Sequence, residues 1–365
     1  MVDLPQPFLV LAPMQDVTDL AFMRTLMQCG GGPDLYVTEY FRVHGDSSLE
    51  KPILASVLEN PTGKPVIAQM IGQDVDALVR TATELLGYEE VSGVDLNLGC
   101  PAPIVCSKNA GGGLLRRLGQ VDEILGRLRE ACGERWFTVK TRLGFESPSE
   151  FQALLDIFAK HDLDMLSIHG RTVRERYQTP VHPDEIRSAV DLLECPVVAN
   201  GNVVNVTTGL RYLEKTRAAG LMIGRGAIRN PWLFAQLREA LGAGGPSEPV
   251  TRRQLLGYIR ILWEETARTR QQWGRDYSAL KHVQRMKRYL NYIVQGLEDE
   301  LEFRMKRSRT QDELFSLLAD FLDCEDPVPD LPSERSKLFC GFSALLSEKS
   351  TDEHALRSPA FKGMN

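Results

Sequence analysis

The chain has 365 residues, of which 43% are hydrophobic and 25% charged, and its net charge is −6. This ordinary globular composition excludes the collagen, coiled-coil and wholly disordered classes, and no run approaches the roughly 18 apolar residues of a membrane span. The acidic total argues, for the chain as a whole, against a surface coated for nucleic acid. Seven cysteines without tight pairing indicate free thiols in a reducing cytoplasm. The N-terminal residues lack the basic start of a signal peptide.

Short apolar runs recur along the first two-thirds of the chain, each ending in glycine, asparagine or another polar residue. There are eight, at residues 8–14, 35–43, 65–72, 93–101, 136–144, 165–172, 196–202 and 219–226. Such runs are typical of strands buried on both faces of a parallel sheet. Helical spacing lies between most of them, at 76–87, 121–132 and 148–161, the last with Ser149 as its start signal.

Eight strand–helix units predict an α/β fold, a (β/α)8 TIM barrel over residues 1–240. A doubly wound open sheet is the alternative. It is disfavoured because the first run is followed by PMQDVTD and not by GxGxxG, and because the strongest glycine-rich signals follow the seventh and eighth runs.

The chain beyond the barrel contains no strand pattern. Residues 241–250 are a Gly/Pro linker, and helical spacing at 251–270, 278–295 and 312–322 predicts a small all-helical domain over 251–323. The remainder, 324–365, opens with a proline-rich stretch and is expected to be a loosely attached C-terminal tail.

Charge is concentrated in the helical part. Residues 251–309 hold 14 basic and 7 acidic residues, a net of +7, which leaves −13 for the rest. Lys281, Arg285 and Arg288 recur at i, i+4 and i+7, opposite an apolar helix face. A solvated helix face would show the same pattern. Because the charge gathers in one appended domain, we favour a contact with a polyanion.

Polar residues stand at the carboxyl ends of nearly every predicted strand, where barrel enzymes carry their working residues. Any one of them could be a satisfied buried polar group, but the set is hard to explain that way. Asn200, Gly201 and Asn202 follow the seventh strand, and Gly224 and Arg225 follow the eighth. Backbone N–H groups at glycines, with an arginine beside them, indicate a phosphate site. Ordinary turn glycines are the alternative, and we favour a phosphorylated cofactor or substrate.

Two further strand-end residues suggest chemistry. Lys140 is either a Schiff-base lysine or a fixed cation beside a cofactor ring, and the residues alone do not separate these. Cys100 can act as a general acid as readily as a nucleophile. Cys106 completes a C-x5-C spacing, but with no further Cys or His nearby we expect no metal site.

Taken together, the motifs resemble a known family. LAPMQDVTD, VDLNLGCPAP, KNAGGGLL, VKTRLG, SIHGRT, ANGN and MIGRGAIRNPWLF occur in the order and spacing of tRNA-dihydrouridine synthases. The resemblance runs from about residue 8 to 235 and more weakly through KHVQRMKRYLNYI. It implies an FMN-binding TIM barrel followed by a helical tRNA-binding domain. The TEYFRVHGD stretch and the basic helix are most like the bacterial subfamily acting at D-loop position 16.

The resemblance also implies roles. FMN, reduced by NADPH as a transient reductant, would pass hydride from N5 to C6 of a uracil in the tRNA D-loop while Cys100 protonates C5. The FMN-binding residues would be Pro13, Met14, Gln69, Lys140, His169, Asn200, Gly201, Asn202, Gly224 and Arg225. Substrate contacts would come from Asn97, Arg142, Arg171 and Tyr177, and from Lys281, Arg285 and Arg288 on the basic helix.

Two other readings survive. One is an FMN-dependent barrel oxidoreductase that acts on a small molecule, a hypothesis that gives the basic helical domain no role. The other is a flavin-less RNA-binding protein on a barrel scaffold, which leaves Lys140, His169 and Cys100 unexplained. We expect a cytoplasmic monomer without a membrane segment, in which NADPH visits the same cleft as the tRNA.

Overall fold

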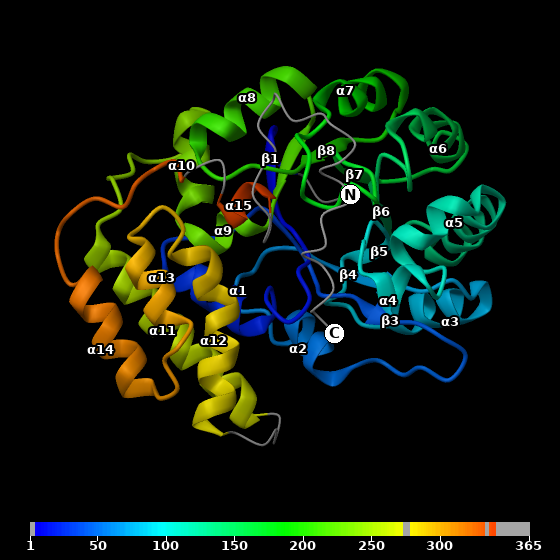
Figure 1. The fold of residues 1–365 in the computed structure, drawn as a ribbon. Helices are drawn as coiled ribbons and strands as arrows, with labels where there is room; N and C mark the ends of the chain where they lie inside the picture. Colours follow the sequence, from blue (N-terminus) through cyan, green and yellow to red (C-terminus); the bar gives the residue numbers. More distant parts are fainter. Residues whose placement is uncertain (1–3, 273–277, 333–335, 341–365) are drawn as a thin grey trace.

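The structure is a computed structural model that describes residues 4–272, 278–332 and 336–340. Its centre is a closed parallel barrel (Figure 1). The strands are β1 (Phe8–Leu11), β2 (Leu35–Val37), β3 (Phe41–Arg42), β4 (Val66–Ile71), β5 (Gly93–Leu98), β6 (Trp136–Arg142), β7 (Met165–His169), β8 (Val197–Asn200) and β9 (Gly220–Ile223). β1 pairs with β9, and β2 pairs with both β1 and β4, so the sheet has no open edge between them. The predicted (β/α)8 TIM barrel is confirmed, and the open doubly wound sheet is excluded.

The apolar run 35–43 forms two strands and not the single one expected. At Thr38 a side-chain hydrogen bond replaces a backbone bond between the strands. Thr38 Oγ1 accepts the N–H of Gln69 at 3.1 Å and donates to the carbonyl of Glu39 at 2.7 Å. Backbone pairing with β4 resumes at Phe41, opposite Met70. Because the apolar pattern continues across this break, the sequence predicts one uninterrupted strand.

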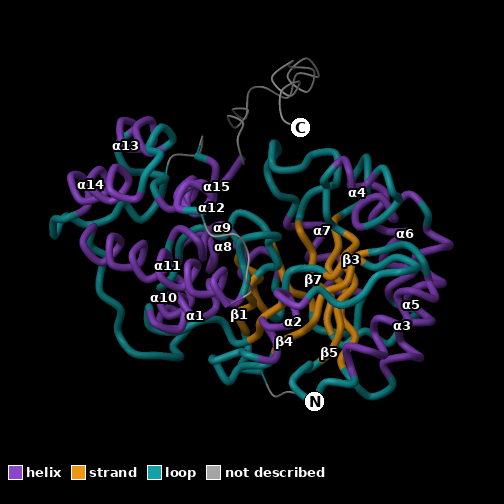
Figure 2. Tube along the Cα trace, turned by 90° about the horizontal axis from the view of Figure 1, so that it is seen from below, coloured by secondary structure: helices purple, strands orange, loops and turns teal. Residues whose placement is uncertain are grey.

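Helices surround the barrel on its outer face (Figures 1 and 2). They are α1 (Leu20–Gln28), α2 (Lys51–Leu58), α3 (Val75–Leu86), α4 (Pro103–Cys106), α5 (Leu118–Cys132), α6 (Phe151–Phe158), α7 (Pro183–Leu192), α8 (Val206–Thr216), α9 (Arg225–Arg229) and α10 (Leu233–Ala240). Short 3₁₀ turns cover Gly111–Arg116 and Pro148–Glu150. The turn before α6 begins with a capping box between Ser147 and Glu150, two residues before the start expected at Ser149.

A helical domain follows the linker 241–250, which forms neither helix nor strand. It contains α11 (Arg252–Gln272), α12 (Ala279–Ile293), α13 (Asp299–Met305) and α14 (Gln311–Leu322). Figure 2 shows it beside the β1–α1 side of the barrel. Tyr289 of α12 stacks on Phe22 of α1 with 6.1 Å between ring centroids, and its hydroxyl donates to the Val17 carbonyl at 3.0 Å. One apolar core is therefore continuous between the two parts. Within the described ranges, no helix has the length and apolar character needed to cross a bilayer.

The described residues after α14 are packed against the barrel and the helical domain, although a loosely attached tail is expected there from the sequence. Arg229 is buried and donates to the carbonyls of Gln295 at 2.8 Å, Asp330 at 3.3 Å and Pro329. The short helix α15 (Lys337–Cys340) places Leu338 against Val204 and Tyr292. Satisfying one buried arginine with three carbonyls and burying Leu338 are the physical reasons for this order. Residues 341–365 of the expected tail lie outside the described residues.

Candidate active site

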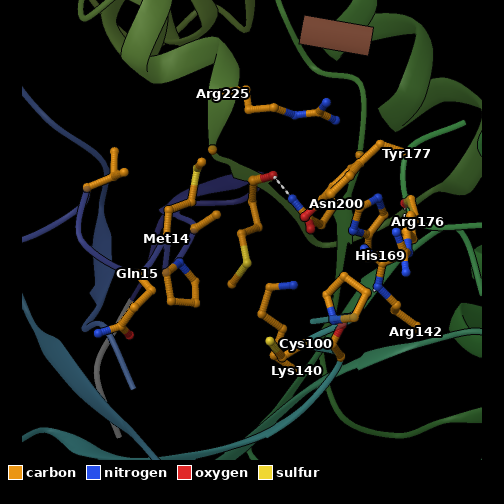
Figure 3. A pocket seen from close by; sticks show the side chains of 18 of the residues that line it. Met14, Gln15, Cys100, Lys140, Arg142, His169, Arg176, Tyr177, Asn200 and Arg225 are labelled. Carbon is orange, nitrogen blue, oxygen red and sulfur yellow. Dashed lines mark hydrogen bonds between the residues drawn. The ribbon is translucent and has the colours of Figure 1, made fainter. Parts of the chain in front are cut away.

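A cavity of about 550 Å³ opens at the carboxyl ends of the strands (Figure 3), within the size range of small-molecule sites. Four cationic side chains and no carboxylate are among the described residues that line it. The sequence-predicted residues that line it are Pro13, Met14, Asn97, Cys100, Lys140, Arg142, His169, Tyr177, Asn200, Gly201, Asn202, Gly224 and Arg225. The cavity is therefore electropositive, which suits an anionic ligand.

The loop that carries Cys100 leaves β5 and is held from two sides. Asn97 Oδ1 accepts the backbone N–H groups of Gly99 at 3.0 Å and Cys100 at 2.9 Å. Arg142 Nε donates to the Gly99 carbonyl at 2.8 Å. The Cys100 side chain is partly exposed and faces the cavity near Lys140 (Figure 3). These bonds fix the backbone that presents the thiol to a ligand.

The glycine run of KNAGGGLL packs directly against this loop. A Cβ at Gly112 would lie 2.9 Å from the Cys100 carbonyl oxygen and 2.5 Å from a methyl of Val173. The Gly112 N–H donates to the same carbonyl at 3.1 Å. Gly111 has φ +54°, and a Cβ added there would lie 3.0 Å from the Cys100 Cβ. Side chains at these glycines would displace the Cys100 loop, which explains why the chain carries none there.

Lys140 lies on β6 opposite Asn97 of β5, and its ammonium group points into the cavity (Figure 3). Burial and the nearby charge of Arg142 lower the pKa of Lys140 to about 8, against a smaller opposing effect of Asp95. Among the described residues no hydrogen bond is recorded for its Nζ. A partly desolvated cation in this position is available to a ligand that carries or gains negative charge.

His169 ends β7 and is almost fully buried. Burial and the positive charges of Arg142 and Arg171 lower its pKa well below the ordinary value, so the ring is neutral at neutral pH. Arg171 Nη1 lies 3.3 Å from His169 Nε2. Because a guanidinium group only donates, Nε2 accepts and the ring proton resides on Nδ1. The His169 ring is therefore a neutral hydrogen-bond donor in the cavity lining, and the positive charge of this wall comes from its neighbours.

The loops after β8 and β9 form the end of the cavity expected to hold phosphate. Asn200 Nδ2 donates to the Met222 carbonyl at 2.7 Å, which ties the two strands together (Figure 3). Gly201 has φ +128°, and a Cβ there would lie 2.9 Å from Val181. The Arg225 guanidinium stacks 4.6 Å from the centre of the Tyr177 ring and donates to the Lys337 carbonyl at 3.0 Å. α15 thus closes this end of the cavity, and Leu338 is part of the lining.

Two predicted contact residues lie behind the cavity wall. Gln69 is fully buried, and its amide is engaged by Asp95 and Asn97. Arg171 is also fully buried and donates to the Thr179 carbonyl at 2.6 Å and to Asn202 Oδ1 at 3.1 Å. Neither side chain is part of the cavity lining, and the polar atoms of both are engaged by neighbouring residues, of which Asn97 and Asn202 line the cavity. The ring contact expected of Gln69 and the substrate contact expected of Arg171 stay predictions.

The three basic residues of α12 do not form one exposed face. Arg285 is largely buried and forms an ion pair with Asp19 at the start of α1, and its expected contact with the substrate stays a prediction. Arg288 is exposed and forms an ion pair with Asp16, with 3.1 Å between Nη1 and Oδ2. Lys281 is exposed near the start of α12. Some of the basic residues of this segment are also paired with acids of the helical domain, as in the Arg252–Glu298 pair at 2.7 Å and the Arg253–Asp323 pair at 2.9 Å.

Sequence reasoning missed several residues of the site. Asp95 is buried beneath it and bonds Gln69 and Thr138. Its position two residues before Asn97 in VDLNLGCP, on the same side of the strand, is a signal that could have found it. Tyr292 of α12 and Leu338 of α15 also line the cavity, although they come from parts of the chain distant in sequence. No local pattern identifies those two.

A closed (β/α)8 barrel with polar and cationic side chains converging at its carboxyl end defines a barrel enzyme. The family model described as dihydrouridine synthase matches residues 10–323. A probable tRNA-dihydrouridine synthase of Helicobacter pylori (strain J99) is 33% identical over 234 residues, 63% of this chain and 70% of that protein. Probable tRNA-dihydrouridine synthase 2 of Bacillus subtilis (strain 168) is 28% identical over 332 residues, which cover 87% of this chain and 95% of that protein. A probable tRNA-dihydrouridine synthase of Staphylococcus aureus (strain COL) is 29% identical over 330 residues, which cover 87% of this chain and 94% of that protein. The chain belongs to the dihydrouridine synthase family and is an enzyme of that family.

Proposed function

We propose that this protein reduces uridine to 5,6-dihydrouridine in the D-loop of tRNA, with FMN held in the cavity and NADPH as the transient reductant. The observation that carries the proposal is the cavity itself: four cations and no carboxylate among its described lining residues, with Cys100 at its wall. Family membership supplies the reaction class. The match to the family model extends through the helical domain, which favours tRNA over the small-molecule substrate of the alternative reading.

FMN fits the residues present. Ala12, Met14 and Met222 offer apolar walls for a flat ring system. At the other end, a Cβ on Gly224 would lie 3.0 Å from Met14 Sδ and 3.3 Å from Ala12 Cβ, so the backbone there approaches the cavity without a side chain. Arg225 stands at this end and supplies a cation for a phosphate group. A hydrogen-bonding His169 and a cationic Lys140 would lie along the ring.

When bound and reduced, FMN would supply a hydride to C6 of the uracil. Cys100 then gives its thiol proton to C5 as a general acid. Asn97 and Arg142 hold the loop that aims this thiol. Asn97 also lines the cavity, and Gln69 engages only one of its two amide hydrogens, so the other is available to a uracil carbonyl. Tyr177 and Arg142 form the adjacent wall.

The base must leave its stack to reach this cavity, at a cost of about a few kcal/mol that pocket contacts offset. Contacts to the tRNA backbone would orient it without reading sequence. The exposed cations Lys281 and Arg288 on α12 are our candidates for this contact. Position 16 of the D-loop is proposed from the resemblance of TEYFRVHGD and the basic helix. We further propose that the enzyme works as a cytoplasmic monomer.

The double variant Lys281→Glu/Arg288→Glu is expected to weaken tRNA binding at least about tenfold and to flatten its salt dependence. The physical reason is that each lost phosphate contact removes about one counterion from the salt slope. Binding is measured by filter retention or fluorescence anisotropy across a series of salt concentrations.

Arg211→Glu/Lys215→Glu is the matched control, because it makes the same charge change at exposed positions of α8 on the outer wall of the barrel. This control should bind tRNA with the wild-type affinity and slope. If both double variants lose affinity equally, the effect is one of net charge and α12 is not the docking surface.

A further inference from the structure

Asp95 lies at the centre of the barrel, one layer beneath the cavity. In the sheet register it stands between Gln69 of β4 and Thr138 of β6. Its side chain is buried and has two partners: Thr138 Oγ1 donates to Oδ1 at 2.7 Å, and Gln69 Nε2 donates to Oδ2 at 2.8 Å. The carboxyl group does not line the cavity, so it cannot act on a ligand directly.

A continuous series of hydrogen bonds leads from Asp95 to the Cys100 backbone. Gln69 Nε2 donates to Asp95, and Gln69 Oε1 accepts from Asn97 Nδ2, at 2.8 Å in each case. Asn97 in turn uses Oδ1 to accept the N–H groups of Gly99 and Cys100. We call this series the Asp95 relay; its members are Asp95, Gln69, Asn97 and the Gly99–Cys100 backbone.

The direction of the relay is determined at both ends. A carboxylate only accepts, so Gln69 must turn its NH₂ group towards Asp95 and its oxygen towards Asn97. Backbone N–H groups only donate, so Asn97 must turn its oxygen towards the Cys100 loop. The two requirements agree, and each amide has one orientation that satisfies both neighbours. With the acceptor-only end removed, the orientation of both amides would be imposed only by the two backbone N–H groups at the Cys100 end.

The ionisation state of Asp95 decides whether its carboxyl group acts only as an acceptor. Burial raises the pKa of Asp95 to about 6, while hydrogen bonds from Thr138 and Gln69 and the charge of Lys140 act in the opposite direction. The carboxyl group is therefore mostly ionised at neutral pH. A protonated Asp95 could donate to Gln69 and would no longer impose the direction of the relay.

We propose that Asp95 is a positioning residue for Cys100, which fixes the orientation of the Gln69 and Asn97 amides and, through them, the backbone that carries the proton-donating thiol. The inference deepens the proposed function and depends on it for the role of the thiol. Asp95 touches neither substrate nor cofactor and acts only through the relay.

Asp95→Asn tests the proposal. An asparagine offers Gln69 either an oxygen or an NH₂ group, so it no longer imposes one orientation on the Gln69 amide. A Gln69 amide that turns over would set its own NH₂ group against the Asn97 donor and strain the bonds from Asn97 to the Gly99 and Cys100 N–H groups. We expect the single-turnover rate of dihydrouridine formation by pre-reduced enzyme to fall at least about tenfold. The rate of Cys100 alkylation by iodoacetamide, followed by peptide mass spectrometry, should change at least about threefold.

Thr138→Val is the matched control. It removes one hydrogen bond from the same carboxylate, but from the oxygen that faces away from the relay. Turnover and alkylation should both remain within about threefold of wild type. If Asp95→Asn behaves like Thr138→Val in both measurements, Asp95 is merely structural and the proposal is wrong. If Asp95→Asn does not fold, Gln69→Met breaks the same relay one link further along and should show the same two losses.

A double-mutant cycle separates the relay from a general disturbance of the barrel. In an Asn97→Ala background the relay is already cut, so adding Asp95→Asn should have little further effect on either rate. Additive losses would overturn the proposal. If the wild type forms no dihydrouridine, the proposed function fails instead, and the alkylation rates of the same variants still decide whether the relay positions Cys100.

Discussion

Replacing Cys100 with alanine is expected to leave FMN bound and reducible by NADPH while lowering the rate of dihydrouridine formation about 10²- to 10⁴-fold, the usual contribution of a positioned general acid. The thiol stands at the cavity wall on a loop held by Asn97 and Arg142, and no carboxylic acid among the described lining residues could replace it as a proton donor. The measurement is a single turnover of pre-reduced enzyme with tRNA, with the product quantified by mass spectrometry.

Cys132→Ala is the control for this experiment. It makes the same chemical change at a buried thiol at the end of α5, away from the cavity. Its single-turnover rate should match that of the wild type. A Cys100→Ala enzyme that forms product at the wild-type rate would contradict the general-acid assignment.

Lys140→Met is expected to slow the reduction of bound FMN by NADPH about 10²- to 10³-fold, as the loss of one preorganised electrostatic contact does elsewhere. Methionine preserves much of the side-chain volume but removes the one ammonium group among the described lining residues, at the place where we propose that the ring gains negative charge. The decrease of flavin absorbance in anaerobic stopped-flow measurements reports the step directly.

The charge of Lys140 also gives this step a pH dependence. Because the pKa of Lys140 is about 8, the ammonium form predominates below that pH, and the reduction rate should fall as the pH rises through it. Lys140→Arg keeps a charge at all these pH values. It should retain most of the rate and lose the decline. A Lys140→Met enzyme with wild-type reduction kinetics would show that the lysine charge has no part in the step.

Much of the site could be predicted because strand ends and barrel geometry are local signals. Asn97, Lys140 and Asn200 each stand near the polar end of an apolar run, and parallel strands bring such ends to one rim. How deep each side chain lies within the barrel could not be predicted, because that depth depends on the register between neighbouring strands. Gln69 pairs with Asp95, one layer below Asn97, so it supports the site from beneath and does not line it.

Contacts between residues far apart in the chain could not be predicted from the sequence either. The spacing of Lys281, Arg285 and Arg288 correctly indicates neighbouring positions on one helix, but the partner of Arg285 is Asp19, 266 residues away. Nothing local to α12 indicates that this arginine faces the barrel. The packing of residues 324–332 and 336–340 was missed for the same reason, since the proline-rich composition does not reveal the Arg229 side chain that binds there.

The most direct test of the account is to incubate the purified enzyme with an unmodified tRNA transcript and NADPH and to map dihydrouridine by mass spectrometry. We expect FMN-dependent formation of dihydrouridine confined to the D-loop, at position 16, and none without NADPH. An enzyme that contains FMN and oxidises NADPH but forms no dihydrouridine in any tRNA would contradict the proposed function.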